Sequence, residues 1–413
     1  MDYITLEKIR ETNRRRVCIF GAGKIGRTWA YEILTCAGFK VECYCDNKLL
    51  PGTEIRDGIR TISFDNLCNA KEQYLVFLAV NEKLQDEIKQ QFDKNEITEY
   101  YEMGFLFLQE LCESIVDSLE EGLLQKYKPV VDDASFLKII FKDEMGRTLD
   151  LENPKTYNEK LQWLKLYNRN PEYTKLVDKY ELKKHVMKSI GKEYVIPTLG
   201  IWNSVEEIEW DKLPDQFVLK CTHDSGSVII CKDKSTFDME SACKRLKRAL
   251  KRNFYWVGRE WPYKNVNPRI MAEQYMEDNG ELRDYKFYTF KGNVALLYVA
   301  TDRMAVTEET KFDFFDRNYN HLNVLNGHPN AEIPPLKPQK YEEMIFVAEK
   351  IAQEIPHVRV DFYEVAGHIY VGEMTFYPLS GLVKFEPEEW DYKLGDLLNL
   401  ERDVVIVSKE TRM

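Results

Sequence analysis

Apolar residues recur along the chain in two different patterns. In the first hundred residues, apolar runs at 17–20, 41–45 and 74–80 alternate with stretches of helical periodicity, which is typical of buried parallel strands joined by helices. From about residue 195 onward, the apolar runs are bounded by turn residues, as in hairpins. The pattern predicts an α/β domain with a parallel sheet of half-Rossmann size, followed by an α+β region.

The segment between these two regions has a helical pattern. Residues 106–124 carry apolar positions at helix spacing with acidic residues between them. We therefore expect three parts: a Rossmann-like domain at 1–105, a helical connector at 106–145 and a larger domain at 146–400. Glycine and proline do not cluster into a linker, so the parts are expected to pack against one another.

Composition narrows the class of protein. Hydrophobic residues make up 44% of the 413 positions and aromatic residues 13%, enough to build real cores. The net charge of −11 argues against nucleic acid as the main partner. The nine cysteines contain no CxxC and the six histidines no metal-ligand spacing, which suits a reducing compartment without a zinc site. With no run of 18 apolar residues and no signal peptide, we expect a soluble cytoplasmic enzyme.

A glycine-rich turn follows the first apolar run. Gly21, Gly23 and Gly26 lie between a predicted strand and a predicted helix, where they permit a tight turn and close helix packing. Asp46 ends the next strand, at the position of a ribose-binding carboxylate. These residues predict a nucleotide site in the N-terminal domain. Its ligand is a UDP-sugar or a dinucleotide such as NAD; the alternative is a docking module that binds nothing.

The most informative pattern is a hairpin near the C-terminus. Asp361 and Glu373 are each six residues from the turn glycine Gly367, so they should face each other on neighbouring strands. Two such carboxylates repel unless a cation lies between them, and oxygen ligands that leave space for phosphate favour Mg²⁺. Arg359 lies two residues before Asp361 and points to the same face. The cluster indicates the phosphate end of a nucleotide-using enzyme; the alternative is a surface hairpin with a charge cluster.

Further segments precede this hairpin in a clear order. Thr156 and Glu159 form a capping box, which predicts a helix start. A small-residue loop at 221–227 follows a strand that ends in a lysine, and its backbone N–H groups can fold over phosphates. The other predicted elements are a helix from Val177, the strands 217–220, 228–231, 269–276 and 281–290, and a turn at 291–293.

This order of motifs resembles the TupA-like branch of the ATP-grasp superfamily, which is associated with teichuronopeptide and capsular polysaccharide synthesis. The resemblance implies an ATP-grasp catalytic domain with antiparallel sheets at residues 146–400, using ATP and Mg²⁺. It spans residues 138–395 and rests on the motifs at 151–160, 177–179, 219–227, 261–264, 284–286, 359–363 and 372–376.

The resemblance also implies roles for individual residues. Lys179 and Lys220 would contact the ATP phosphates as point charges, and Arg359 would stabilise an acyl-phosphate or a tetrahedral oxyanion. Backbone groups of Gln274 and Tyr275 would read the purine. The remaining implied ATP contacts are Ser225, Gly226 and Ser227 in a flexible loop at 222–227, together with Glu273, Met276 and Lys286; the implied metal ligands are Asp361, Glu373 and Thr375.

The roles of Thr375 and His223 are less clearly set by the resemblance. Thr375 stands where many ATP-grasp enzymes carry an asparagine, and a hydroxyl is a weaker metal ligand than an amide carbonyl. His223, inside the predicted loop, is either a general base or a hydrogen-bonding loop residue.

A basic cluster stands out against the acidic background. It predicts a docking face for an anionic acceptor, such as a uronic-acid polymer, a lipid pyrophosphate carrier or the inner membrane surface. Aromatic residues at 254–256 could stack on sugar rings; the alternative is a solvated helix above core aromatics. The cluster comprises Lys244, Arg245, Lys247, Arg248, Lys251 and Arg252.

Together these observations predict an ATP- and Mg²⁺-dependent carboxylate–amine ligase that acts through an acyl-phosphate and forms an amide or peptide bond. The resemblance places it in surface-polysaccharide synthesis, with a small-molecule amine and a carboxylate on a sugar or polymer as substrates. We expect it in the cytoplasm, or peripherally at the inner membrane face. Two alternatives are an NAD- or sugar-nucleotide-dependent sugar-modifying enzyme or glycosyltransferase, and a non-catalytic ATP-binding assembly factor.

Overall fold

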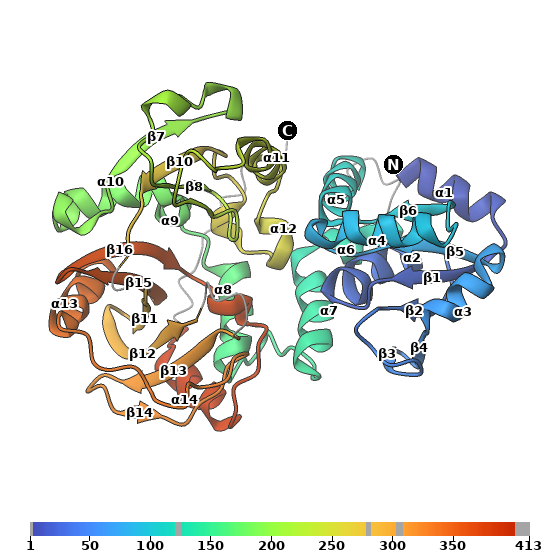
Figure 1. The fold of residues 1–413 in the computed structure, drawn as a ribbon. Helices are drawn as coiled ribbons and strands as arrows, with labels where there is room; N and C mark the ends of the chain where they lie inside the picture. Colours follow the sequence, from blue (N-terminus) through green and yellow to red (C-terminus); the bar gives the residue numbers. More distant parts are fainter. Residues whose placement is uncertain (1–2, 120–124, 278–281, 303–308, 401–413) are drawn as a thin grey trace, which may run out of the picture. The chain divides into compact units, whose positions relative to one another are not determined.

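The chain divides into two compact units, Met1–Gly146 and Arg147–Met413 (Figure 1). The computed structural model describes residues 3–119, 125–277, 282–302 and 309–400. Within those ranges, no helix has the length and apolar character needed to span a membrane.

A six-stranded sheet forms the centre of the N-terminal unit. Its strands lie in the order β3-β4-β2-β1-β5-β6, and all neighbours are parallel except the edge pair β3 and β4. The three predicted parallel strands are present. The sheet also contains β3, β4 and β6, which the sequence did not predict because they have only three or four residues and are partly exposed. The strands are β1 (Arg16–Phe20), β2 (Val41–Cys45), β3 (Glu54–Arg56), β4 (Ile59–Ile62), β5 (Tyr74–Leu78) and β6 (Tyr100–Glu102).

Helices surround this sheet and form the predicted connector. Arg27 contacts Asp143 and Glu144 at 2.8 Å each, and the ring of Trp29 lies 4.2 Å from that of Phe136, so the last connector helix packs on the first helical segment. Residues 120–124 of the predicted connector helix lie outside the described residues. The helices are α1 (Tyr3–Thr12), a π-helix (Ile25–Ala30), α2 (Tyr31–Cys36), α3 (Phe64–Asn69), α4 (Glu82–Lys94), α5 (Phe105–Leu119), α6 (Lys128–Val131) and α7 (Asp133–Met145).

Two antiparallel sheets form the second unit, which confirms the predicted fold class. The smaller sheet has the order β7-β10-β8-β9 and the larger one β14-β13-β12-β11-β15-β16. The strands of the smaller sheet are β7 (Thr198–Trp202), β8 (Phe217–Cys221), β9 (Ile229–Cys231) and β10 (Ile270–Gln274). Those of the larger sheet are β11 (Asp284–Phe290), β12 (Asn293–Thr301), β13 (Lys311–Asp316), β14 (His321–Leu322), β15 (His357–Val365) and β16 (His368–Thr375).

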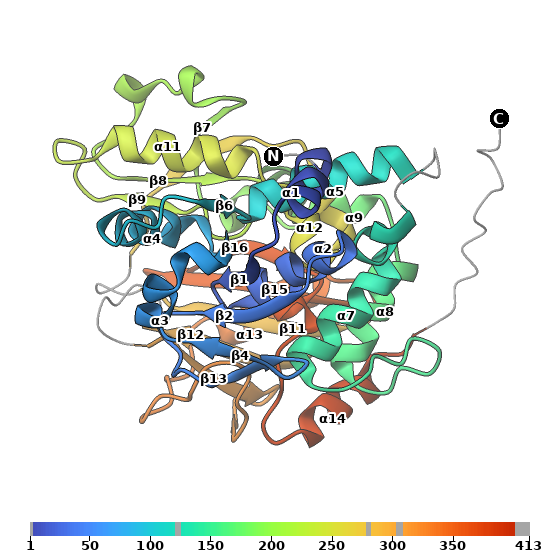
Figure 2. The same ribbon diagram turned by 90° about the vertical axis from the view of Figure 1, so that its right-hand side faces the viewer.

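Each of these sheets buries one face against a helix. The apolar stripe Ala242, Leu246 and Ala249 of α11 packs into the core of the smaller sheet, and α11 lies along β8 in both views (Figures 1 and 2). Helix α13 packs on β11 and β12 over the largest core of the chain. The helices are α8 (Tyr157–Tyr167), α9 (Glu172–Val177), α10 (Lys179–Ser189), α11 (Met239–Leu250), α12 (Tyr255–Gly258), α13 (Tyr341–Ile351) and α14 (Glu389–Leu397).

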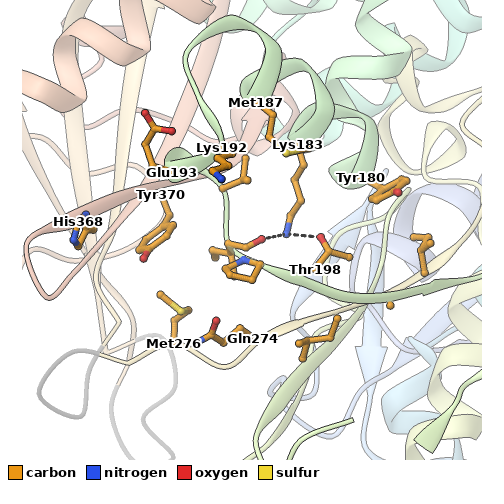
Figure 3. A pocket seen from close by; sticks show the side chains of 16 residues that line it. Tyr180, Lys183, Met187, Lys192, Glu193, Thr198, Gln274, Met276, His368 and Tyr370 are labelled. Carbon is orange, nitrogen blue, oxygen red and sulfur yellow. Dashed lines mark hydrogen bonds between the residues drawn. The ribbon is translucent and has the colours of Figure 1, made fainter. Parts of the chain in front are cut away.

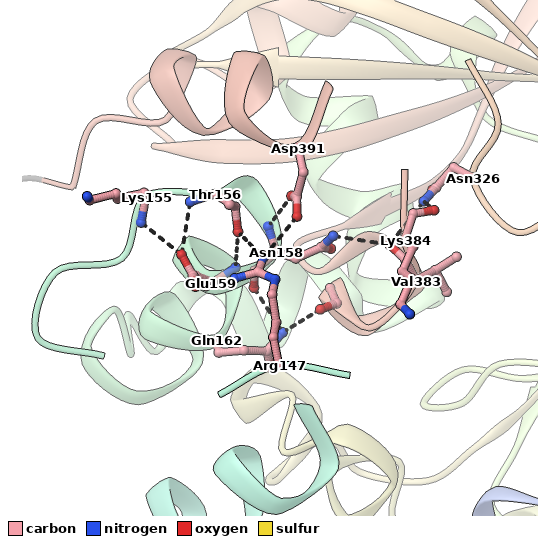
Figure 4. Close-up of polar contacts among 11 residues, drawn as sticks. Arg147, Lys155, Thr156, Asn158, Glu159, Gln162, Asn326, Val383, Lys384 and Asp391 are labelled. Carbon is pink, nitrogen blue, oxygen red and sulfur yellow. Dashed lines mark hydrogen bonds and ion pairs between the residues drawn. The ribbon is translucent and has the colours of Figure 1, made fainter. Parts of the chain in front are cut away.

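The start of α8 is a polar junction (Figure 4). The capping box predicted at Thr156 and Glu159 is confirmed. Arg147 contacts Glu159 and donates to Thr156 Oγ1 at 2.9 Å and to Asp391 Oδ2 at 3.3 Å. Asp391 Oδ1 in turn accepts the backbone N–H of Asn158 at 2.9 Å. The junction therefore ties α8, the first helix of the second unit, to the N-terminal part of α14.

The same helix fixes the segment that follows β16. Leu379 and Ser380 adopt left-handed φ angles of 48° and 59°, which non-glycine residues rarely hold without support. Gln162 Nε2 donates to Gly381 O at 2.8 Å, and the buried Lys165 Nζ donates to Ser380 O at 2.8 Å. Side chains of α8 therefore hold a strained turn directly after the strand that carries Glu373.

Candidate active site

The β15–β16 hairpin pairs Asp361 with Glu373, as predicted, but only because its register shifts once between the turn and these residues. Ala366 and Gly367 have φ angles of 50° and 76°, the positive values that a tight two-residue hairpin turn requires. Strict pairing outward from this turn would place Asp361 opposite Gly372, but a register shift beside Phe362 places it opposite Glu373, and Arg359 opposite Thr375. One face of the hairpin thus carries two carboxylates, a guanidinium and a hydroxyl.

Arg359 connects these groups. Its guanidinium donates to both oxygens of Asp361, at 2.6 and 2.7 Å, in a bidentate pair. The Nη2 atom also lies 3.2 Å from Glu373 Oε1 and 3.1 Å from Thr375 Oγ1. The cation between the two carboxylates is therefore an arginine side chain, and all three proposed metal ligands lie within its reach.

Lys286 joins the cluster from β11. It is the register partner of Asp361, and its ammonium contacts that carboxylate and lies 2.8 Å from Asp284 Oδ2. Burial raises the pKa of Asp361 to about 6, against the lowering effect of Arg359 and Lys286. Partial burial also opposes ionisation of Glu373, but Lys286, Lys179 and Arg359 outweigh it and hold the pKa of Glu373 below its usual range. The two carboxylates thus share one sheet face but differ in their affinity for a proton.

A second charged group lies on the smaller sheet. Glu273 is only 4% exposed, and its two oxygens lie 2.5 Å from the ammonium groups of Lys183 and Lys220. Burial raises the pKa of Glu273, but the two lysines reverse the effect and lower it. Glu273 is therefore a buried counter-ion that fixes the position of Lys220, one of the predicted phosphate contacts.

Lys183 is the residue that the sequence analysis missed. It lies on α10, one helical turn after Lys179, and also donates to Ile196 O at 2.6 Å and Thr198 Oγ1 at 3.2 Å. Burial lowers its pKa, while Glu273 opposes that shift. Its spacing from Lys179 was the available signal, because residues four apart share one helix face.

A cavity of about 740 Å³ opens beside this group (Figure 3). Lys183, Gln274 and Met276 lie on its wall, and Tyr370 closes it from β16, so both sheets of the unit contribute. Such a volume accommodates a nucleotide base with its sugar. Its lining also includes Tyr180, Met187, Lys192, Glu193, Val195, Ile196, Pro197, Thr198, Leu199, Gly200, Ile201 and His368.

The predicted purine-reading residues take different positions around this cavity. The Gln274 N–H donates to Pro197 O at 3.0 Å, so it is committed to the protein backbone. Tyr275 is absent from the cavity wall; its hydroxyl donates to Glu277 at 2.7 Å and Lys232 lies 5.8 Å from its ring centre. Alternation along an extended segment accounts for this, since neighbouring side chains point to opposite faces.

The predicted phosphate loop, residues 222–227, is only partly exposed. Thr222, His223 and Asp224 are buried, whereas Ser225 and Gly226 are exposed. Lys179 donates from its ammonium to the Asp224 carbonyl. Half of the loop that was expected to be flexible is therefore anchored, because its polar groups bond to neighbouring elements.

A comparison with protein-family models identifies the family of the region that contains this site. The model described as "TupA-like ATPgrasp" matches residues 159–399, more than half of the chain. The chain belongs to the TupA-like ATP-grasp family. The prediction of an ATP-grasp enzyme is therefore confirmed, and the match includes every residue of the carboxylate cluster and of the lysine–glutamate group. No curated protein matches the chain.

Solved structures with distant similarity include two ligases. An L-amino acid ligase from Bacillus licheniformis is 12% identical, with a TM-score of 0.37, covering 94% of this chain and 76% of that one. A D-alanine–D-alanine ligase from Bacillus anthracis complexed with ATP is 12% identical, with a TM-score of 0.34 and coverage of 93% and 96%. The assignment rests on the family model, since these scores are too low to support it.

The basic cluster of the ATP-grasp unit lies on α11 and directly after it. Lys244 pairs with Glu240 and Lys247 with Glu206, each at 2.6 Å, so carboxylates already balance part of its charge. Tyr255 and Trp256 are buried, which favours the alternative of core aromatics over sugar stacking for these two residues. Their burial follows from α12, which turns both rings into the protein interior.

The predicted nucleotide residues of the N-terminal unit serve the turn itself. Asp46 Oδ2 accepts the Ala22 N–H at 2.9 Å, and Oδ1 accepts that of Lys48 at 2.9 Å. A Cβ on Gly26 would lie 1.8 Å from the Gly21 carbonyl, so close packing within the turn requires glycine there. Gly23 has open space around it. These contacts explain the motif without a ligand, and the nucleotide site stays a prediction.

Proposed function

We propose that this protein is an ATP- and magnesium-dependent carboxylate–amine ligase. The observation that carries the proposal is the pairing of Asp361 with Glu373 on the sheet face that holds Arg359 and Lys286, within the region matched by the ATP-grasp family. The cavity beside Lys183 supplies a place for the adenosine end of ATP. Lys220 on β8 and Lys179 on α10 are proposed to supply positive charge for the phosphates of ATP.

The donor set fits Mg²⁺. Asp361, Glu373 and Thr375 offer only oxygen atoms, which magnesium prefers. A site with two carboxylates relies on ATP phosphates and water for its other ligands. When bound, the ion neutralises charge on the β- and γ-phosphates.

Phosphoryl transfer comes first in the proposed reaction. A carboxylate oxygen of the acid substrate attacks the γ-phosphorus of ATP, the bond to the β-γ bridging oxygen breaks, and ADP leaves. Such a transfer needs positioning and charge neutralisation more than covalent help from the protein. Lys220, fixed by Glu273, and Lys179, fixed at the phosphate loop, are the groups proposed to hold the phosphates, with Arg359 placed to stabilise the acyl-phosphate.

Amide formation follows. The nitrogen of a neutral amine attacks the carbonyl carbon of the acyl-phosphate, the carbon–oxygen bond to phosphate breaks, and the amine loses a proton. The products are an amide or peptide bond, ADP and phosphate. Arg359 is suited to stabilise the tetrahedral oxyanion because it is a buried guanidinium on the same sheet face.

For the acceptor, we propose a carboxylate on a sugar or polymer of the cell surface, joined to a small-molecule amine. The cations on and after α11 that the structure leaves exposed, including Arg245, Arg248 and Lys251, support an anionic acceptor or carrier lipid near the inner membrane face. A capsule or teichuronopeptide pathway follows from family association alone. The division into domains at 1–105, 106–145 and 146–400 is part of the same proposal, as is a UDP-sugar or dinucleotide at Gly21, Gly23, Gly26 and Asp46.

Thermal unfolding against different ligands tests the proposal. At about 100 times its Kd, Mg-ATP should add roughly 2.7 kcal/mol to the stability of the unit that binds it. At the same Mg²⁺ concentration most of the stabilisation should be lost in Glu373→Gln, and a positive result leads to a screen of acid and amine pairs for ADP release. Stabilisation by NAD(H) but not by Mg-ATP would contradict the ligase and favour a sugar-modifying enzyme; ATP binding without ADP release in any mixture would favour an assembly factor.

A further inference from the structure

The phosphate loop has an anchored stem and an exposed tip. The stem consists of Thr222, His223 and Asp224, which are all at most 2% exposed, and the tip begins at Ser225. Gly226 has a φ of 93°, in the left-handed region, and a Cβ there would meet open space. The tip can therefore adapt to a ligand, while its position depends on whatever holds the stem.

His223 ties the stem to the end of α11. Its Nε2 atom lies 3.2 Å from Ala249 O and 3.0 Å from Arg252 O. Carbonyl oxygens only accept, so Nε2 carries the hydrogen and donates to both. Ala249 O also accepts the Arg252 N–H at 3.0 Å, so the imidazole is a further donor at this end of α11 and joins it to the loop.

The protonation state of His223 suits this role. Burial lowers the pKa of His223, although Asp224 opposes the shift, so the ring is neutral near pH 7. Its Nδ1 atom is buried and meets no donor among the residues that the structure describes. With Nε2 occupied and the side chain 2% exposed, the ring is poorly placed to take a proton from a substrate.

Other contacts hold the stem from different sides. The Thr222 N–H donates to Arg269 O at 2.9 Å, Thr222 O accepts the Lys179 N–H at 3.0 Å, and Thr222 Oγ1 donates to Asp178 Oδ2 at 3.2 Å. These contacts reach the start of β10 and the start of α10. Among the hydrogen bonds of the described stem residues, those of His223 are the ones that reach α11.

We propose that His223 is a positioning residue for ATP: it holds the phosphate loop against the C-terminal end of α11, so that Ser225, Gly226 and Ser227 meet the nucleotide phosphates. The inference rests on the ATP binding proposed above and adds a residue to it. It also chooses between the two roles considered for this histidine, in favour of the hydrogen-bonding one.

Glutamine and asparagine substitutions at His223 separate this role from general packing. Glutamine can place an amide N–H near the position of Nε2 and keep the bond to α11, whereas the shorter asparagine reaches only the position of Nδ1. His223→Gln, His223→Asn and His223→Ala are compared with the unmodified full chain by calorimetric titration with Mg-ATP and, separately, with adenosine. Thermal unfolding without ligand shows which variants fold.

We expect the Kd for Mg-ATP to rise about tenfold in His223→Asn and His223→Ala, as for the loss of one hydrogen bond, and to stay within about threefold in His223→Gln. The Kd for adenosine, which has no phosphates, should not change. Equal Mg-ATP affinities in the glutamine and asparagine variants would overturn the proposal, as would a parallel loss of adenosine binding. An unmodified chain that does not bind Mg-ATP would instead refute the proposed function itself.

Discussion

Lys183 Nζ lies 2.5 Å from Glu273 Oε1, and both side chains are more than nine-tenths buried. The other oxygen of Glu273 holds Lys220 at the same distance. One carboxylate therefore stabilises two ammonium groups that would otherwise be buried without a counter-charge. This arrangement makes the smaller sheet dependent on a single acidic side chain.

Replacing that side chain should destabilise the second unit. In Glu273→Gln the two ammonium groups lose their counter-charge, and we expect a cost of about 3 kcal/mol, as for other broken buried ion pairs. Urea denaturation of the two proteins measures the difference. Glu277→Gln, an exposed glutamate four residues on, is the matched control and should change stability by less than about 0.5 kcal/mol. Similar stabilities for both variants would show that the lysines find other partners.

Thr375 should act through its hydroxyl. We expect Thr375→Ala to raise the Mg²⁺ concentration needed for half-maximal ATP-dependent stabilisation about tenfold, and Thr375→Ser to leave it nearly unchanged. Glu373→Gln should raise it about 100-fold, because it removes a charged ligand. Magnesium titrations at fixed ATP give these values. If alanine and serine behave alike, Thr375 is not a metal ligand.

His357 should make the second unit sensitive to acid. Its Nδ1–H donates to Thr289 O and its Nε2 accepts the Tyr157 hydroxyl, both at 2.8 Å. Burial lowers its pKa from 6.5 to about 3. Below pH 6.5 the His357 ring is therefore protonated in the unfolded chain but stays neutral in the folded chain. The free energy of unfolding falls as the pH drops from 6.5 towards 3.

Between pH 7.5 and pH 5 this effect amounts to about 2 kcal/mol. His357→Asn keeps a donor for Thr289 but cannot gain the proton, so its loss of stability over that range should be smaller by this amount. Denaturation at both pH values, in both proteins, measures it. Equal losses would mean that His357 is protonated in the folded state.

Asp46 should contribute to the N-terminal unit without affecting ATP. Its bonds to the Ala22 and Lys48 N–H groups suggest that Asp46→Ala costs about 1 kcal/mol per bond lost. The affinity for Mg-ATP should be unchanged, since the proposed ATP site lies in the second unit. A change in Mg-ATP affinity would show that the two units are coupled, and UDP-sugar or NAD binding lost in this variant would support the N-terminal nucleotide site.

The parts of the site that depend on local pairing could be predicted from sequence. The turn at Ala366 and Gly367 indicated the hairpin and brought Asp361 and Glu373 onto neighbouring strands. The register shift that places them opposite each other was not predicted, because a two-residue turn alone would pair Asp361 with Gly372. The capping box at Thr156 is equally local. The parallel core strands were visible because they are largely apolar, whereas β3, β4 and β6 are short and partly exposed.

The parts that depend on distant contacts could not be predicted. Lys183 looks like any helix-surface lysine until β10 brings Glu273 against it. His223 gave no sign of its bond to α11, because that bond spans 26 residues. The burial of Tyr255 and Trp256 likewise depends on how α12 packs. The residue types of the basic cluster and its neighbouring aromatics do not reveal that packing.

The junction of Arg147 with Thr156, Glu159 and Asp391 has a practical consequence for anyone who excises the ATP-grasp part. A fragment cut to the family match, residues 159–399, would keep every candidate metal ligand and phosphate contact, yet begin after Arg147 and Thr156. Helix α8 would then start without its N-cap. The strained turn at Ser380 would be held by side chains of a helix whose first turn is no longer capped. An inactive fragment of that length would say nothing about the chemistry of the whole chain.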